Sequence, residues 1–588
     1  MRDTRHGPVR EGEAVRFRLW APSSREVLLQ RPDAEPLPME RDEEGFFSVA
    51  IPAAPGDLYR FRADGLDVPD PASRGQMGDV EGWSRLRLNP LGPVRPAPVR
   101  PWHETILCEV HVGTVTPEGS FRALAEKLPY FVEAGYTAIE LLPVNDFPGR
   151  WNWGYDGVLP FAPDESYGTP EDLRALVDAA HDLGLGIMLD VVYNHFGPSG
   201  NYLPHYAGSF FTEKTKTPWG AAIDLANPVV RAFFTENAAM WLGEYDFDGL
   251  RFDAVHAFPP DGGDDLLADL VRACRAVKPD AWLVLENDDN AARWLVREEG
   301  RPRHFTAQWD DDIHHALHVL ATGQTSGYYE DYAEDPTGAL LRCLTEGFAY
   351  QGEPSRHRGG MPRGESSADL PPDAFVSFIQ NHDQIGNRPF GDRIAATISP
   401  EELAVIHGIV MLSPQIPMFF MGEEAAVTTP FPFFADFEGD LAEAVREGRK
   451  REFAGFFADH EGSVEDLPDA LEESTVAKAR LDWGELGSGE RETALARFRE
   501  LATLRRRLVW PLAASGYRGT TCARDGGAVR VTWDFEAGAL TLAANPSGGP
   551  ARFEGIDAPP AHSLGEVRIA EGVVQLGPWS LALWSDAG

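Results

Sequence analysis

The chain has 588 residues, enough for about three to four domains, and its composition is that of an ordinary globular protein. Asp and Glu number 92 against 53 Lys and Arg, and the formal net charge of -39 argues against nucleic acid or an anionic membrane as a partner. The first residues lack the apolar core of an export signal, and no run of about 18 apolar residues occurs, so we expect a cytoplasmic protein that does not cross a membrane. The four cysteines form no C-x-x-C pair, which argues against a zinc site or a disulfide framework.

The first hundred residues have the pattern of short strands and turns. Apolar and polar side chains alternate with period two at 15–20 and 58–64, which predicts a small antiparallel β-sandwich. The proline-rich stretch 90–101 cannot form a β-ladder and predicts a stiff linker. We therefore place the first domain boundary there.

From residue 102 the pattern changes to an apolar strand followed by an amphipathic helix, repeated along the chain. Eight apolar segments are predicted strands: 106–112, 138–144, 186–192, 249–252, 282–285, 305–309, 375–379 and 416–421. Helical patterns lie between and after them: 121–134, 170–183, 228–245, 264–277, 337–350, 401–412 and 490–508. Eight such units predict an α/β fold with a closed parallel (β/α)8 barrel of the triosephosphate isomerase type, in which the chemistry lies at the C-terminal ends of the strands.

Period-two alternation returns beyond about residue 510 and predicts a second all-β sandwich at the C-terminus. The expected domains are 1–100, 101–512 and 513–588, with a short insertion in the barrel at 194–227 and a longer one at 425–487.

Acidic side chains gather at the predicted strand ends. Arg251 and Asp253 share one face of the fourth strand, a pattern that in isolation is most often a surface salt bridge. Glu286 ends the fifth strand and Asp383 follows the seventh, so several strand ends carry a carboxyl. Glycosidic bonds are broken by a pair of carboxyls, and a separation of about 5–5.5 Å is associated with retention of configuration. The cluster predicts a glycosidase site, although each side chain taken singly would be a solvated loop charge.

Four segments resemble, in order, the four sequence regions of the α-amylase superfamily of glycoside hydrolases: 190–195, 249–253, Glu286 and 381–383. The resemblance implies that Asp253 is the nucleophile, Glu286 the general acid and base, and Asp383 the stabiliser of the transition state. It also implies that Arg251 orients the nucleophile. The N-terminal segment 17–22 resembles the sandwich modules of starch-debranching and branching enzymes, where either sugar binding or packing against the barrel is an open role.

The same resemblance implies a set of sugar-binding groups around the cleaved bond. His195 and His382 would hold the sugar, and Tyr155 matches the tyrosine that stacks on it, unless it only packs at the rim. The predicted substrate-binding set is completed by neighbours in the same motifs: Asp156, Gln384 and Asn387.

The chain departs from typical α-amylases just after the nucleophile. His256 and Ala257 stand where those enzymes have Lys and His, so the sugar sites on the leaving-group side should differ. The stretches 308–318 and 430–453 resemble the maltooligosyltrehalose trehalohydrolases, which cut the α-1,4 bond joining a maltooligosaccharide to a terminal trehalose. This resemblance implies that maltooligosyltrehalose and related α-glucans are the partners.

Within the first of these stretches, the resemblance favours contact of three side chains with the trehalose end: Asp310, Asp311 and His314. The alternative is a helix start, because acidic residues suit a positive helix N-terminus and His314 with His318 would share a face. In the second stretch, four aromatic residues are either core or a wall of the leaving-group pocket: Phe431, Phe433, Phe434 and Phe437.

We expect no metal and no other cofactor. Many α-amylases bind calcium through the asparagine that corresponds to Asn194, but the short excursion 194–227 lacks the expected partner ligands.

Two other functions stay open. One is an α-glucan branching or debranching enzyme, which shares the module and the barrel, and the other is a non-catalytic barrel, which would not need all three acids. The sequence indicates no oligomeric state.

Overall fold

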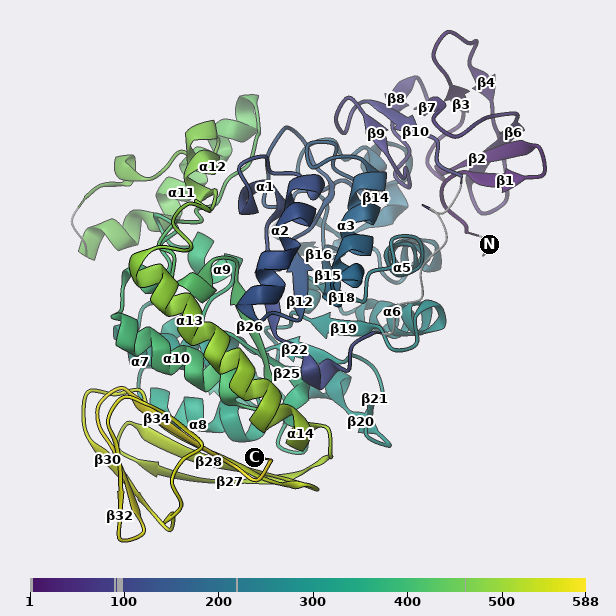
Figure 1. Cartoon of the computed structure of the whole chain (residues 1–588). Coiled ribbons are helices and arrows are strands. Elements are labelled where there is room, and N and C mark those ends of the chain that lie inside the picture. The colour runs from purple at the N-terminus through teal and green to yellow at the C-terminus, as the bar shows by residue number, and fades with distance from the viewer. Residues whose placement is uncertain (1–3, 89–90, 92–98, 218–219, 460–461, 588) are drawn as a thin grey trace.

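The computed structural model describes residues 4–88, 91, 99–217, 220–459 and 462–587. Its centre is a closed barrel of eight strands that pair in parallel and in chain order around the ring (Figure 1). These strands are β11 (Leu107–Val110), β12 (Ala138–Leu141), β15 (Gly186–Val191), β18 (Gly249–Phe252), β19 (Trp282–Leu285), β22 (Ala307–Trp309), β25 (Phe375–Ser377) and β26 (Ile416–Phe420). Each lies inside one of the eight predicted segments, so the predicted barrel is confirmed.

Helices surround the barrel (Figure 1): α2 (Phe121–Ala134), α3 (Pro170–Asp182), α5 (Pro228–Gly243), α6 (Gly263–Val277), α7 (Asp311–Thr322), α8 (Pro336–Glu346), α10 (Pro400–Leu412) and α13 (Gly489–Leu504). Local sequence fixes their starts. Thr169 caps α3 in a reciprocal capping box with Asp172, and Pro170 takes the first helical position, where its missing N–H costs nothing. Seven of these helices were predicted, and α7 corresponds to the helix-start alternative for the histidine-rich stretch.

Residues that point into the barrel form an apolar layer below a charged layer. The apolar layer includes Leu107, Ala138 and Met188, which belong to one buried cluster. Side chains two residues further along a strand share its face, so the layer above them holds polar groups. These are Glu109, Glu140, Asp190 and Arg251, on the first four strands of the barrel. The barrel therefore carries buried charge directly below its C-terminal rim.

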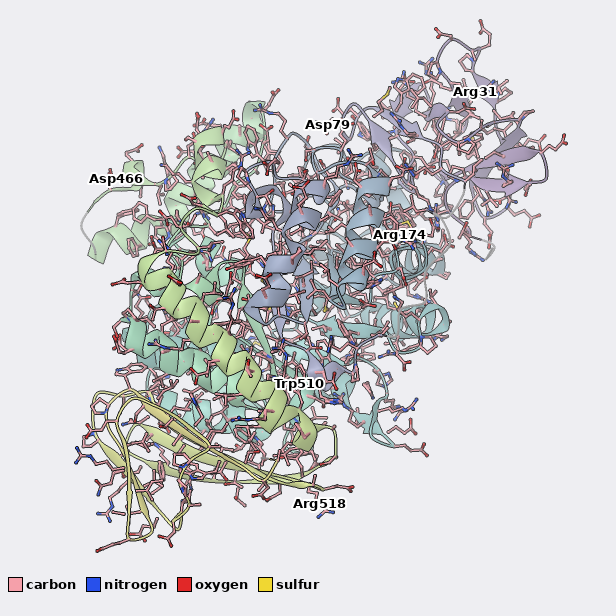
Figure 2. The ribbon with its side chains drawn as sticks, viewed as in Figure 1. Arg31, Asp79, Arg174, Asp466, Trp510 and Arg518 are labelled. Carbon is pink, nitrogen blue, oxygen red and sulfur yellow. The ribbon has the colours of Figure 1, made fainter. Side chains whose placement is uncertain are left out.

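The N-terminal domain is all β, as predicted. Its strands are β1 (Val9–Glu11), β2 (Ala14–Trp20), β3 (Val27–Gln30), β4 (Leu37–Pro38), β5 (Glu40–Arg41), β6 (Phe46–Ile51), β7 (Leu58–Ala63), β8 (Leu66–Val68), β9 (Gln76–Met77) and β10 (Trp83–Arg85). It packs against the barrel domain, because Arg74 donates to Glu244 at 3.2 Å and Asp79, labelled in Figure 2, accepts from the Gly149 N–H at 3.0 Å. Most of the predicted linker 90–101 lies outside the described residues.

The C-terminal domain is also all β, as predicted. Its strands are β27 (Tyr517–Asp525), β28 (Ala528–Phe535), β29 (Gly538–Asn545), β30 (Ala551–Glu554), β31 (His562–Leu564), β32 (Val567–Ala570), β33 (Val573–Leu576) and β34 (Ser580–Ser585). They form a five-stranded and a three-stranded sheet. Trp533 ties this domain to α8 by donating its indole N–H to the Leu344 carbonyl at 2.9 Å. The domain boundaries near residues 100 and 512 stay predictions.

Smaller elements decorate the barrel. The strands are β13 (Asn145–Asp146), β14 (Leu159–Pro163), β16 (Phe211–Thr217), β17 (Gly220–Ile223), β20 (Arg297–Glu298), β21 (Arg301–Pro302), β23 (Glu353–Ser355) and β24 (Met361–Arg363). The helices are α1 (Val112–Val115), α4 (Leu203–Tyr206), α9 (His382–Gly386), α11 (Gly439–Asp459), α12 (Glu473–Ala479) and α14 (Trp510–Ala513). The four cysteines are free, and within the part of the chain that the structure describes no helix is long and apolar enough to span a bilayer.

Candidate active site

One buried arginine joins the acids of three adjacent strands. Arg251 on β18 is fully buried, and its Nη1 donates to Asp190 Oδ2 at 2.5 Å and to Asp253 Oδ1 at 2.7 Å. Its Nη2 donates to Glu286 Oε2 at 2.6 Å. Such charge-assisted bonds fix geometry as well as charge. The structure therefore brings together Arg251, Asp253 and Glu286, as the sequence predicted.

The two central carboxyls have opposite protonation preferences. Burial raises the pKa of Asp253, but the charges of Arg251 and His195, with hydrogen bonds from Asn194 and Glu286, bring it below its ordinary value. Burial also raises the pKa of Glu286, and the nearby negative charge of Asp253 adds to this, so that it lies well above its ordinary value despite Arg251. An ionised Asp253 beside a protonated Glu286 is the arrangement that a nucleophile and a general acid require.

Backbone and amide groups complete this pair. Asn194 donates its side-chain N–H to Asp253 Oδ2 at 2.6 Å and to the Asp253 carbonyl at 3.0 Å. Ala254, which has a left-handed φ of 39°, donates its backbone N–H to Glu286 Oε2 at 2.8 Å. The chain therefore turns sharply after Asp253, and the next backbone amide reaches Glu286.

Tyr155, His195 and His382 line the same site. The Tyr155 hydroxyl donates to Asp190 Oδ2 at 2.6 Å, and its ring stacks on His382 with centroids 4.9 Å apart and planes inclined by 17°. The Nε2 of His195 lies 2.9 Å from the Tyr155 carbonyl, and burial lowers the pKa of this histidine. Contacts within the site therefore fix the positions of these three rings.

Asp383 is the most exposed of the three predicted catalytic acids, with 39% of its side chain accessible. It lies in the short helix α9, which Asn381 caps. The backbone N–H and Nδ1 of His382 face the two oxygens of Glu109, at 2.9 and 2.6 Å, and its Nε2 lies 3.4 Å from Asp383 Oδ2. The structure therefore links Asp383 to the barrel interior through His382.

Four more predicted residues lie near this group. Gln384 accepts the Asn381 N–H at 2.9 Å and donates to Asp311 Oδ1 at 3.4 Å, and Asn387 ends the same helix. Burial raises the pKa of Asp311 to about 7, helped by the charges of Asp288 and Asp383. Asp156 lies on the other side, where it accepts from the Asn152 amide at 2.7 Å.

His256 lies at an exposed position beside the loop that follows Glu286. Its Nδ1 accepts the Asp288 N–H at 3.2 Å. It lines an open hollow of about 480 Å³ whose wall includes Trp294, Arg358 and Glu365. The position that departs from typical α-amylases therefore borders open space beside Asn287, the residue that follows Glu286.

Two predicted substrate ligands do not reach this rim. Asp310 is fully buried and caps α7 through the Ile313 N–H at 3.4 Å. His314 is 1% exposed, and its ring nitrogens bond the Ile379 carbonyl and, at 3.0 Å, the Tyr329 hydroxyl. In this structure both residues fit the helix-start alternative: Asp310 caps α7, and His314 is buried within it.

The predicted aromatic wall divides into core and rim. Phe431 and Phe434 are fully buried, and Phe437 is 8% exposed. Phe433 is half-buried and meets the Trp153 ring edge-on at 5.2 Å. Only Phe433 has the exposure that a sugar contact needs.

Several important residues escaped sequence reasoning. Asn194 corresponds to a calcium ligand of many α-amylases, but in this structure its side chain binds Asp253, the predicted nucleophile. Glu109 and Glu140 are single acids inside apolar strands, and the period-two alignment with Asp190 and Arg251 was the signal that could have found them. Among the residues that the structure describes, no group of three or more His, Cys, Asp or Glu side chains is arranged to hold a metal ion. Independence from metal stays a prediction.

Comparison with known proteins agrees with this geometry. Residues 103–219 match the model of the alpha amylase catalytic domain, and residues 5–83 match carbohydrate-binding module 48, the isoamylase N-terminal domain. A malto-oligosyltrehalose trehalohydrolase from Deinococcus radiodurans is 41% identical over 85% of this chain and 82% of that protein. The corresponding protein from Saccharolobus solfataricus is 40% identical over 75% of this chain and 79% of its own length.

A crystal structure of a Salmonella typhimurium protein, 41% identical, superposes with a TM-score of 0.93 over 99% of both chains. Identity at this level over most of each relative exceeds what a shared barrel alone would produce. The chain belongs to the malto-oligosyltrehalose trehalohydrolase family, within the α-amylase superfamily of glycoside hydrolases.

Proposed function

We propose that this protein is a retaining glycoside hydrolase that cleaves the α-1,4-glucosidic bond next to the trehalose end of maltooligosyltrehalose, releasing trehalose and a maltooligosaccharide. Family membership supports the substrate class. The observation that carries the reaction type is the shared Arg251 guanidinium, whose Nη1 binds Asp253 at 2.7 Å and whose Nη2 binds Glu286 at 2.6 Å. Inverting enzymes keep their carboxyls about 6.5–9.5 Å apart to admit a water, and retaining enzymes about 5–5.5 Å. Two carboxyls bound to one guanidinium favour the shorter separation.

In the first step Asp253 attacks the anomeric carbon of the glucose on the non-reducing side of the bond. Glu286 gives its proton to the departing trehalose oxygen, so the C–O bond breaks as the Asp253–carbon bond forms. Asp383 balances the positive charge that develops on the sugar ring. Arg251 and Asn194 hold the attacking carboxylate in place.

In the second step water replaces trehalose. Glu286, now ionised, takes a proton from the water, whose oxygen attacks the same carbon and releases Asp253. The maltooligosaccharide leaves with its original anomeric configuration, because two inversions cancel. Every proton lost by Glu286 in the first step is thus recovered in the second.

The leaving-group side is proposed to be the source of trehalose selectivity. His256 and Asp311 flank the catalytic acids there, and the polar hollow beside His256 offers donors and acceptors to a disaccharide. A hydrogen-bonding site rejects a ligand that lacks the matching groups more strongly than an apolar pocket rejects a larger one. Replacing His256 by the lysine of typical α-amylases should therefore weaken discrimination between trehalose and maltose as leaving groups.

A two-substrate assay tests the proposed function. Incubation with maltooligosyltrehalose should release free trehalose, and incubation with amylopectin should leave its branching unchanged. Altered branching without trehalose release would favour the branching or debranching alternative and contradict the proposal.

Three buried free cysteines, with no disulfide among the described residues, support a reducing cytoplasmic location.

A further inference from the structure

Glu109 lies beneath the proposed active site and takes no part in the mechanism given above. It is 1% exposed in β11, on the face that points into the barrel. Its two oxygens are occupied by one residue: Oε1 lies 2.6 Å from His382 Nδ1, and Oε2 accepts the His382 backbone N–H at 2.9 Å. A carboxylate that holds both the backbone and the ring of one histidine fixes the position and rotation of that ring.

We propose that Glu109 is a positioning residue that orients the His382 ring and keeps both of its nitrogens as donors, so that Nε2–H points to Asp383 and the bound sugar. The inference rests on the proposed function for its sugar, but its geometry does not depend on which glucan binds. Nε2 lies 3.4 Å from Asp383 Oδ2, so a carboxylate faces each side of the ring. A neutral imidazole can donate from only one nitrogen, whereas the imidazolium donates from both.

The surroundings favour this charged form. Burial lowers the pKa of His382, but Asp383 and Glu109 outweigh burial and Arg251 and raise it to about 9. Charged and titratable groups face the ring from every side: Glu109 on β11, Glu140 on β12, Arg251 on β18, Asp383 on α9, His111 and Tyr155. The imidazolium therefore holds below about pH 9 and is lost as the pH rises through that value.

Removing the Glu109 charge should lower the pKa of His382. Glu109 presents a separate oxygen to each of the two His382 groups, whereas a glutamine in the same position would present an oxygen to one group and its NH2 donor to the other. With Asp383 as the remaining partner, burial should dominate, and the ring should lose its proton at least one pH unit lower. His382 would then no longer donate to both Asp383 and the barrel.

The chain provides a matched control in Glu140. It pairs in register with Glu109 on the neighbouring strand and is also 1% exposed. Neither of its oxygens has a hydrogen-bond partner among the described residues, and burial, together with Asp190, raises its pKa well above the ordinary value. Glu140→Gln therefore replaces one neutral buried group by another of the same shape and removes no hydrogen bond from His382.

The experiment compares wild type, Glu109→Gln and Glu140→Gln in the full-length protein. Histidine labelled with ¹³C at Cε1 is followed by NMR between pH 5 and pH 10, and the His382 signal is assigned by its loss in His382→Gln. We expect a wild-type midpoint near pH 9. The midpoint should fall by at least one unit in Glu109→Gln and stay within about 0.3 units in Glu140→Gln.

Kinetics provide a second readout. The kcat/KM of Glu109→Gln should fall at least tenfold below that of wild type at pH 8, where the His382 of the variant has lost its proton. The loss should shrink at pH 5, where the ring is protonated in both enzymes. Equal profiles for the two variants, or a wild-type His382 that is neutral at pH 7, would overturn the proposal. The wild-type titration decides even if Glu109→Gln fails to fold, and trehalose release by wild type tests the proposed function independently.

Discussion

Substituting Arg251 by lysine should separate the contribution of guanidinium geometry from that of positive charge. Arg251 reaches three carboxyl groups at 2.5–2.7 Å through two nitrogens that point in different directions. A lysine ammonium keeps the charge but is a single point on a flexible stem, so it can bridge one of them well and not all three. At least two of the three bonds should be lost.

The magnitude follows from the kind of bond. A hydrogen bond to a charged group contributes about 1.5–3 kcal/mol, so two lost bonds amount to about 3–6 kcal/mol. If these bonds hold Asp253 and Glu286 in their reacting geometry, the loss falls on the transition state, and kcat/KM should drop by about 10²- to 10⁴-fold. The Lys variant should still fold, because the buried positive charge is retained.

The assay is trehalose release from maltooligosyltrehalose, measured as initial rate against substrate concentration. Arg74→Lys is a suitable control, because Arg74 also donates to a carboxylate, that of Glu244, but lies in the N-terminal domain. The control should retain wild-type kinetics. An Arg251→Lys enzyme within threefold of wild type would refute the assigned role of the guanidinium.

Three other outcomes are expected. Asn194→Ala should lower kcat by about tenfold or more, because it removes the hydrogen bond to the Asp253 carboxylate as well as the one to the Asp253 carbonyl. A strong KM effect alone would contradict this. The pH profile of kcat/KM should be bell-shaped, since activity is lost as pH falls through the lowered pKa of Asp253 and as it rises through the raised pKa of Glu286. Prolonged chelation followed by desalting should leave the rate unchanged within twofold, and recovery of a lost rate by calcium would refute metal independence.

A further prediction concerns stability: Asp312 is fully buried and accepts from Arg363 at 2.8 Å and from the Ala349 and Tyr350 N–H groups at 2.8 and 2.9 Å. Asp312→Asn should destabilise the barrel by about 3 kcal/mol, because Arg363 loses its fully buried counter-charge and keeps only Asp288, which is partly exposed. Calorimetry should show a lower melting temperature, and an unchanged one would contradict this role.

The barrel could be predicted because its strands are buried on both faces and read as apolar runs between polar turns. Each predicted strand segment contains an observed strand. The meeting of Asp253 and Glu286 could be predicted because strand ends in a parallel barrel lie at one rim, where separate motifs converge. The N-terminal and C-terminal sandwiches could be predicted because apolar and polar residues alternate there with period two, whereas the barrel segment between them contains helical patterns.

The sequence did not predict how deeply individual polar side chains are buried or which partners they meet. Asp310 caps α7 and His314 lies within it, and α7 is buried on several faces. A periodic sequence pattern shows which side chains share a helix face, but not whether that face meets solvent or protein. The pairing of Glu109 with His382 spans 273 positions, and a single acid in an apolar strand gives no local sign of its partner. Asn194 likewise meets Asp253 only because β15 and β18 are neighbours.

The most direct test of the account follows the first product by NMR. Wild-type enzyme is mixed with maltooligosyltrehalose, and anomeric proton signals are recorded before mutarotation becomes significant. Free trehalose should appear together with a maltooligosaccharide whose new reducing end is the α-anomer, and Asp253→Asn should produce neither at a rate within 10³-fold of wild type. Initial formation of the β-anomer, or near-normal turnover by Asp253→Asn, would contradict a retaining mechanism through Asp253.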